Sequence, residues 1–122
     1  EQAVLRRAAT AYAERLRDGR TLVMRHFPLG TRCSEPAGGM VLWVGLPASV
    51  AVERLYERAT AAGLCFAPGY IFGVHAQHRR HLRLCVSRLH AEARAAIAAI
   101  GRLACAIAGT TPDDREPQET RP

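Results

Sequence analysis

The stretch that decides the fold is RHLRLCVS, residues 80–87, because its side chains alternate between apolar and polar. Alternation with a period of two is typical of a β-strand that buries one face and exposes the other. The apolar positions are Leu82, Leu84 and Val86, and the positions between them are His81, Arg83, Cys85 and Ser87. The strand predicted here therefore presents the guanidinium of Arg83 on the face turned away from the core.

Two further extended segments lie upstream, in TRCSEP (residues 31–36) and GGMVLWVGLP (residues 38–47). Proline and glycine bound both runs, which predicts an antiparallel pair of strands. Residues 40–44 are apolar at every position, so we expect the second strand to be central and covered on both sides. Another strand is predicted at LCFAP, residues 64–68.

Three segments show the spacing of amphipathic helices. The first covers residues 2–26, the second runs from an N-cap at Ser49 to about Ala62, and the third runs from about Ser87 to Ala108. Gly63 and Gly109 follow the second and third segments and are suited to end them. The residues expected on the buried faces are Leu5, Ala9, Tyr12, Leu16 and Val23, then Val52, Leu55, Tyr56 and Ala59, then Leu89, Ala93, Ala96, Ile97, Ile100, Leu103, Ala104 and Ile107.

The order of these elements predicts an α+β fold, a small and mostly antiparallel sheet of three to four strands with helices packed on it. A chain of 122 residues is long enough for one domain with a real core. We assign residues 1–109 to that domain. Residues 110–122, TTPDDREPQETRP, are rich in proline and charge and predict a mobile tail.

The bulk composition excludes some classes of protein. The net charge is +6, all 17 basic residues are arginine, and no lysine is present, so chemistry that needs a lysine amine cannot take place within this chain. The sequence has neither an apolar run of the roughly 20 residues that span a membrane nor a secretory signal, and we expect a cytoplasmic protein. Aromatic residues are few and no recognition module can be read, which argues against nucleic-acid binding by this segment.

The cysteines do not predict a metal site. Cys33, Cys65, Cys85 and Cys105 lack the C-x-x-C spacing of zinc ligands, so we expect four free thiols. Cys65 and Cys85 fall in apolar runs, where a thiol can pack as a small hydrophobic group.

Two other clusters also have simple explanations. His75, His78 and His81 are spaced by three but stand beside arginines, which favours a solvated basic loop over a metal site. Gly38 and Gly39 lack the spacing of a phosphate-binding loop and predict a tight turn. We expect no metal ion and no catalytic residue within this chain.

Three separated blocks carry a resemblance to a known family. SEPAGGMVLWVGLP (34–47), AVERLYERATAAGLCFAPGYIF (51–72) and HLRLCVS (81–87) occur in order and precede a terminal amphipathic helix. Together they resemble the C-terminal small domain of fold-type-I, pyridoxal-phosphate-dependent aminotransferases of class I/II. The likeness is closest to the aminotransferase-like domain of MocR-type regulators in the GntR family, and to aminoadipate-type transaminases.

This resemblance implies roles for a few residues. Arg83 stands where the family's arginine binds the α-carboxylate of the amino-acid substrate, and Tyr70 and Phe72 are weaker candidates for lining the cleft. Cys85 stands where the family often has asparagine or serine. The cofactor pyridoxal phosphate is expected in a full-length parent, held by a large domain outside this chain, and none is expected on this segment alone.

Three functions remain open from the sequence. The first is the effector-binding part of a MocR-type transcriptional regulator, whose partners would be the large domain, an amino-acid or cofactor-type effector, and DNA through an N-terminal winged helix-turn-helix. The second is the small domain of an active aminoadipate-type transaminase. Both imply a homodimer and no membrane contact. The third is a self-standing basic α+β module that binds an anionic ligand or partner.

Overall fold

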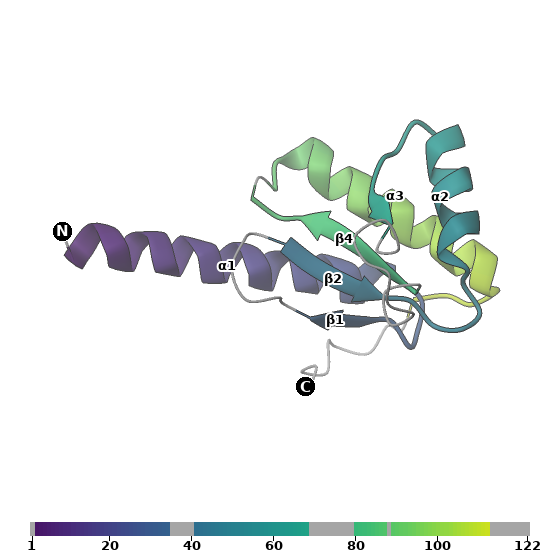
Figure 1. The fold of residues 1–122 in the computed structure, drawn as a ribbon, viewed down its shortest axis with the longest axis horizontal. Helices are drawn as coiled ribbons and strands as arrows, with labels where there is room; N and C mark the ends of the chain where they lie inside the picture. Colours follow the sequence, from purple (N-terminus) through teal and green to yellow (C-terminus); the bar gives the residue numbers. More distant parts are fainter. Residues whose placement is uncertain (1, 35–40, 69–79, 88, 113–122) are drawn as a thin grey trace.

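The elements of the chain follow the predicted order, and the fold class is α+β (Figure 1). The computed structural model describes residues 2–34, 41–68, 80–87 and 89–112. Within these ranges the elements are α1 (Gln2–His26), β1 (Arg32–Ser34), β2 (Val41–Gly45), α2 (Val52–Ala61), β3 (Ala67–Pro68), β4 (His81–Cys85) and α3 (Ala91–Ala108). The first helix has the predicted bounds.

The strand that carries Arg83 is central in the sheet. The strand order is β1-β2-β4-β3, and every neighbouring pair is antiparallel, which confirms the predicted pairing of β1 with β2. β4 therefore lies between β2 and β3 and is not an edge strand. β3 is shorter than the predicted 64–68, because the Leu64 N–H donates to the Ala59 carbonyl oxygen (2.8 Å) and ties the start of this segment to α2.

The helices bury one face of the sheet. On β2 and β4 this face consists of Leu42, Val44, Leu82 and Leu84, all buried. One apolar cluster joins the sheet to all three helices through Val44, Leu82, Val23, Leu55 and Ile100. Figure 1 shows α1 and α3 lying behind the sheet, and α3 contacts both α1 and α2.

The outer face of β2 differs from the prediction. We expected this strand to be covered on both sides, yet Val41 and Trp43 are only partly buried while Leu42 and Val44 are fully buried. The helices in the described ranges share the Leu42 side of the sheet. The apolar outer positions of β2 are therefore left partly open to solvent.

The start of α2 was also predicted wrongly. Ser49 is not the N-cap, because a turn closed by the Val50 N–H and the Pro47 carbonyl oxygen (3.0 Å) precedes the helix, which begins after Ala51. Tyr56, expected on the buried face, is 37% exposed. Its ring instead meets the Phe66 ring edge-on, with centroids 5.5 Å apart.

The last helix begins later than predicted. α3 starts at Ala91 rather than near Ser87, and its N-cap is His90, whose ring Nδ1 accepts a hydrogen bond from the Ala93 N–H (3.2 Å). A histidine ring can satisfy a free N–H of the first turn as an asparagine or serine side chain does. At the other end, Gly109 adopts a left-handed conformation (φ 74°) and ends the helix as predicted.

The four cysteines are thiols, but two of them are not packed as expected. Cys65 and Cys85 are exposed, because Cys85 lies on the outward face of β4 and Cys65 precedes β3 at the surface. Cys105 is buried on α3, where its Sγ contacts the carbonyl oxygen of His26 at 3.5 Å.

The chain after α3 begins by pairing with the segment that follows α1. The Thr110 N–H donates to the Cys105 carbonyl oxygen (3.2 Å), and Pro112 forms a bridge with Pro28. Residues 113–122 of the predicted tail lie outside the described residues. No helix in the described part of the chain is long and apolar enough to cross a membrane.

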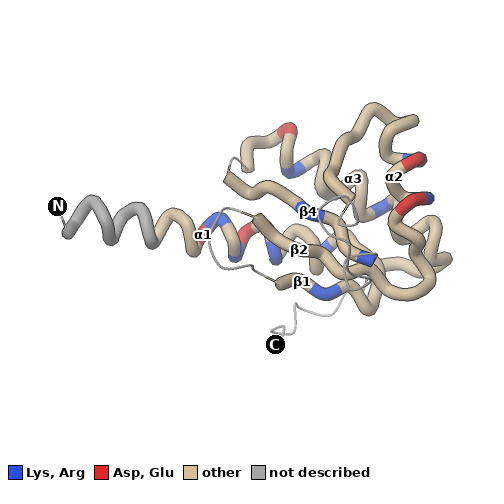
Figure 2. Tube along the Cα trace, in the orientation of Figure 1, with Lys and Arg blue, Asp and Glu red and all other residues tan. Residues whose placement is uncertain are grey.

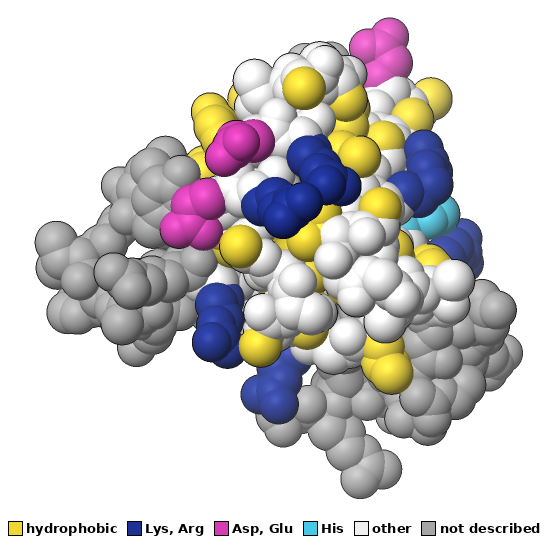
Figure 3. Space-filling model, turned by 90° about the vertical axis from the view of Figure 1, so that its right-hand side faces the viewer, with side chains coloured by type: hydrophobic (Ala, Val, Ile, Leu, Met, Phe, Trp, Pro, Cys, Tyr) yellow, Lys and Arg dark blue, Asp and Glu magenta, His cyan; other side chains and the backbone are white. Residues whose placement is uncertain are grey.

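Charge is spread over the described surface. Arginines occur on each of the three helices and on β1 and β4 (Figure 2). On the side seen in Figure 3, the basic side chains are scattered among acidic and hydrophobic ones and form no single stripe. This distribution differs from the continuous basic surface that follows a nucleic-acid backbone.

Candidate functional site

The candidate site is built around Arg83 at the middle of β4. Its neighbours along the strand, Leu82 and Leu84, are 0% and 6% exposed and face the helices. The alternation of a strand then directs Arg83 to the other face, where its side chain is exposed. A guanidinium on a central, well-anchored strand has a backbone position that the core determines.

The residues beside Arg83 follow from the strand register. Arg83 is opposite Trp43 of β2 on one side and Ala67 of β3 on the other, while His81 and Cys85 flank it along β4. Side chains of directly paired residues start about 5 Å apart on the same face. On this face the Arg83 side chain therefore starts next to an indole, a methyl group, an imidazole and a thiol.

Two of these neighbours contact each other. The rings of Trp43 and His81 meet edge-on, with centroids 6.3 Å apart and an interplanar angle of 78°. Gly45, which is paired with His81, makes room for this arrangement, because a Cβ at Gly45 would lie 3.3 Å from Nε2 of His81. The two rings thus form an aromatic surface next to Arg83.

Cys85 makes the site chemically distinctive. Its Sγ lies 3.1 Å from Oγ of Ser87, and the two groups share a hydrogen bond. Hydrogen bonds from the Ser87 side chain and backbone lower the pKa of the Cys85 thiol, the positive charge of Arg83 lowers it further, and partial burial opposes the shift. The thiol is thus more readily ionised than an ordinary cysteine, directly beside a guanidinium.

A cleft of about 460 Å³ adjoins the end of β4. It lies between α1 and the connection from β4 to α3, and its lining residues are Ala11, Glu14, Arg15, Asp18, Ser87, Leu89, His90 and Arg94. The Arg15 guanidinium donates to the Ser87 carbonyl oxygen at 2.6 Å. This bond fixes the chain just after Cys85 to the first helix.

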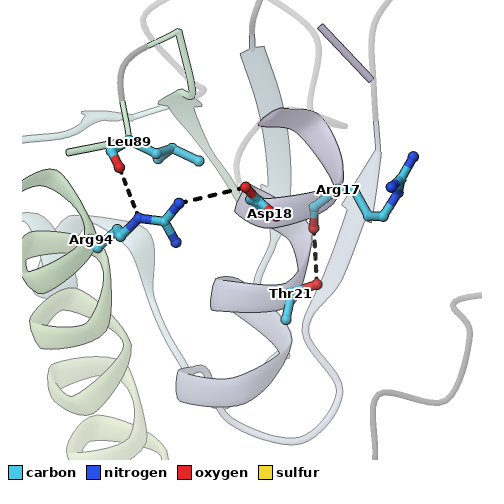
Figure 4. Close-up of polar contacts among 5 residues, drawn as sticks. All are labelled: Arg17, Asp18, Thr21, Leu89 and Arg94. Atoms are coloured by element: carbon cyan, nitrogen blue, oxygen red, sulfur yellow. Dashed lines mark hydrogen bonds and ion pairs between the residues drawn. The ribbon is translucent and has the colours of Figure 1, made fainter. Parts of the chain in front are cut away.

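Arg94 makes a second tie across the same cleft (Figure 4). Its Nε donates to the Leu89 carbonyl oxygen at 2.8 Å, and its Nη2 lies 3.5 Å from Oδ2 of Asp18. Both charged side chains are about half exposed, so the ion pair itself contributes little stability. The sequence analysis did not find Arg15, Asp18 or Arg94, because no motif links them to residues more than seventy positions away.

Several residues named from the sequence lie outside the described residues. They are Tyr70, Phe72, His75, His78, Gly38 and Gly39. Within the described ranges, no group of three or more histidine, cysteine, aspartate or glutamate side chains could hold a metal ion. His81, the third histidine of the predicted basic loop, belongs to β4 and contacts Trp43.

The sequence of this chain is similar to a known protein family and to individual members of it. Residues 2–100 match the model of aminotransferase class I and II. The chain is 31% identical over 88 residues to 2-aminoadipate transaminase of Thermus thermophilus, covering 72% of this chain and 22% of that protein. It is 32% identical over 69 residues to aromatic-amino-acid aminotransferase 1 of Thermococcus litoralis, covering 56% of this chain and 16% of that protein.

Among solved structures, the α-aminoadipate aminotransferase of Thermus thermophilus superposes with a TM-score of 0.70 and 28% identity. That structure is a complex with N-(5'-phosphopyridoxyl)-L-leucine. The match covers 86% of this chain and 27% of the other, so this chain spans about a quarter of the length of that relative.

Proposed function

Because this chain belongs to the aminotransferase class I and II family, we propose that it is the small domain of an amino-acid transaminase in which Arg83 binds the substrate's α-carboxylate. One observation carries this proposal. Arg83 projects from the outward face of a central strand, on the side away from the helices, while the buried leucines on either side of it fix the strand.

The chemistry of the guanidinium suits this role. Its planar N–H groups match the two oxygens of a carboxylate, so one side chain can hold the group in a fixed orientation. Strand β4 pairs with neighbours on both sides, which limits its movement. A carboxylate bound there is therefore held at a defined position on the outward face of the sheet.

The reacting groups belong elsewhere in the protein. Pyridoxal phosphate, when bound, supplies the electron sink for bonds broken at the substrate's α-carbon. This chain contains no lysine to form a Schiff base with the cofactor, so its residues do not fit the role of cofactor holder. We assign this chain the tasks of binding and orienting the carboxylate, and we assign cofactor binding to the large domain.

We favour the transaminase over the MocR-type regulator. Both relatives named above are aminotransferases, and the solved relative carries a cofactor–amino-acid adduct. The short share of those relatives that this chain spans favours a longer parent over a self-standing module.

A winged helix-turn-helix encoded upstream would instead support the regulator. The homodimer and the large domain stay predictions.

The proposal is tested in the full-length parent by steady-state kinetics. We expect Arg83→Ala to lower kcat/KM for an amino-acid substrate. The loss should correspond to about 2–4 kcal/mol of transition-state binding free energy. Arg54→Ala is the matched control, because Arg54 is an exposed arginine on α2 and should leave kcat/KM unchanged. Equal kcat/KM in the Arg83 variant and the wild type would refute the assignment.

A further inference from the structure

We infer that Trp43 contacts the side chain of the bound substrate and makes the site select amino acids with aromatic or large apolar side chains. This inference rests on the proposed function, in which Arg83 holds the α-carboxylate. Trp43 lies directly opposite Arg83 in the register of β2 with β4. It is the largest apolar side chain among the neighbours of Arg83 on this face.

The connectivity of an amino acid limits where its side chain can lie. The α-carbon is about 1.5 Å from the carboxyl carbon, and the side chain starts one bond further on. A substrate whose carboxylate is held by Arg83 therefore has its side chain within reach of the residues that flank that arginine. Among the residues that the structure describes, these are Trp43, Ala67, His81 and Cys85.

Of these four neighbours, Trp43 offers the best contact for an apolar group. Ala67 presents a single methyl group, and the Cys85 thiol is engaged with Ser87. The imidazole of His81 stands edge-on against the indole and supports it. An aromatic side chain packed on the indole gains both buried apolar area and a favourable ring geometry.

The indole is held in place before any ligand arrives. Leu42 and Val44 on either side of Trp43 are fully buried, so the core fixes the backbone of β2 at this point. The edge-on contact with His81 then restricts the rotation of the indole. A preorganised contact of this kind adds to selectivity because little side-chain entropy is lost on binding.

The charges on this face disfavour one class of substrate. Arg32 and Arg83 both occupy outward positions, and the described strands carry no acidic residue on this side. A substrate with a cationic side chain would meet the like charges of both arginines here. Selectivity is therefore expected to follow the order aromatic, then small aliphatic, then basic.

The test measures kcat/KM of the full-length protein for phenylalanine, alanine and lysine as amino donors. We expect Trp43→Ala to lower the phenylalanine-to-alanine ratio about three- to tenfold, whereas Trp43→Phe retains most of it. Arg54→Ala, on α2 and away from this face, should leave the ratio unchanged. If Trp43→Ala does not fold, Trp43→Leu decides, since it keeps apolar bulk and removes the ring.

An unchanged ratio in the Trp43 variant, or an equal loss with all three donors, overturns the inference and leaves the role of Arg83 intact. A wild-type preference for lysine overturns it as well. Failure of the proposed function gives a different result, because Arg83→Ala would then leave kcat/KM unchanged for every donor.

Discussion

Gly19 of α1 lies against Val86, the residue that follows β4, so closely that a Cβ at Gly19 would fall 2.6 Å from Cγ1 of Val86 and 2.9 Å from Cδ1 of Leu42. The helix can approach the sheet at this point only because residue 19 has no side chain. The contact places α1 three residues along the chain from Arg83. The first helix and the candidate carboxylate-binding strand are therefore packed as one unit.

Replacing Gly19 tests this packing. In an exposed helix, Gly→Ala adds up to about 1 kcal/mol of stability. Here we expect Gly19→Ala to lower the free energy of unfolding by about 1–3 kcal/mol instead, because the methyl group overpacks the contact. Urea denaturation measures the change, and Ala13→Ser, at an exposed position of α1, is the control. A gain in stability would show that α1 does not approach the sheet this closely.

The ionisation of Cys85 should depend on Ser87. The hydrogen bonds from Ser87 are the largest cause of the lowered pKa of the Cys85 thiol. Ser87→Ala should therefore raise that pKa. The thiolate is the reactive form, and the pH at which iodoacetamide alkylates Cys85 at half its maximal rate should move upward. Mass spectrometry of the peptide containing Cys85 separates its modification from that of the other cysteines. Ser34→Ala, on β1, should not change the profile, and an unchanged profile for Ser87→Ala would contradict the assignment.

His26 should make the fold less stable in acid. Burial lowers the pKa of its imidazole, and the charges of Arg102 and Arg25 lower it further. The unfolded chain then binds a proton at a higher pH than the folded chain does, so the contribution of His26 is fully present above the unfolded pKa, near 6.5, and is lost as the pH falls below it. As the pH falls from 7 to 5, the unfolding free energy of the wild type should therefore decrease relative to that of His26→Gln.

Arg102→Ala provides a second measurement for the same group. Removing one of the two facing guanidiniums should move the pKa of His26 partway back toward its ordinary value, which an NMR titration of the imidazole resolves. A pKa that falls on loss of Arg102 would contradict this account of the electrostatics.

Much of the fold follows from local patterns. The first helix could be placed because its apolar spacing persists over 25 residues, and Arg83 could be assigned to the outward face because β4 alternates strictly. The starts of α2 and α3 were misplaced, because a turn at Pro47 precedes α2 and because His90 caps α3.

The surroundings of Arg83 could not be predicted in the same way. The pairing of Trp43 with Arg83 depends on β4 entering the sheet between β2 and β3, which no local pattern specifies. The tie between Arg15 and the Ser87 carbonyl group depends on the same long-range packing. The sequence thus identifies the chemical group of the candidate site, while the three-dimensional arrangement identifies its neighbours.

The most direct test of the central claim compares the binding of an amino acid with that of its carboxamide to the full-length protein. The carboxamide keeps the size of the ligand and removes the charge that Arg83 is proposed to bind. We expect Arg83→Ala to weaken binding of the amino acid by at least about tenfold and to leave binding of the carboxamide nearly unchanged. Equal effects on both ligands, or no effect on the amino acid, would contradict the role of Arg83.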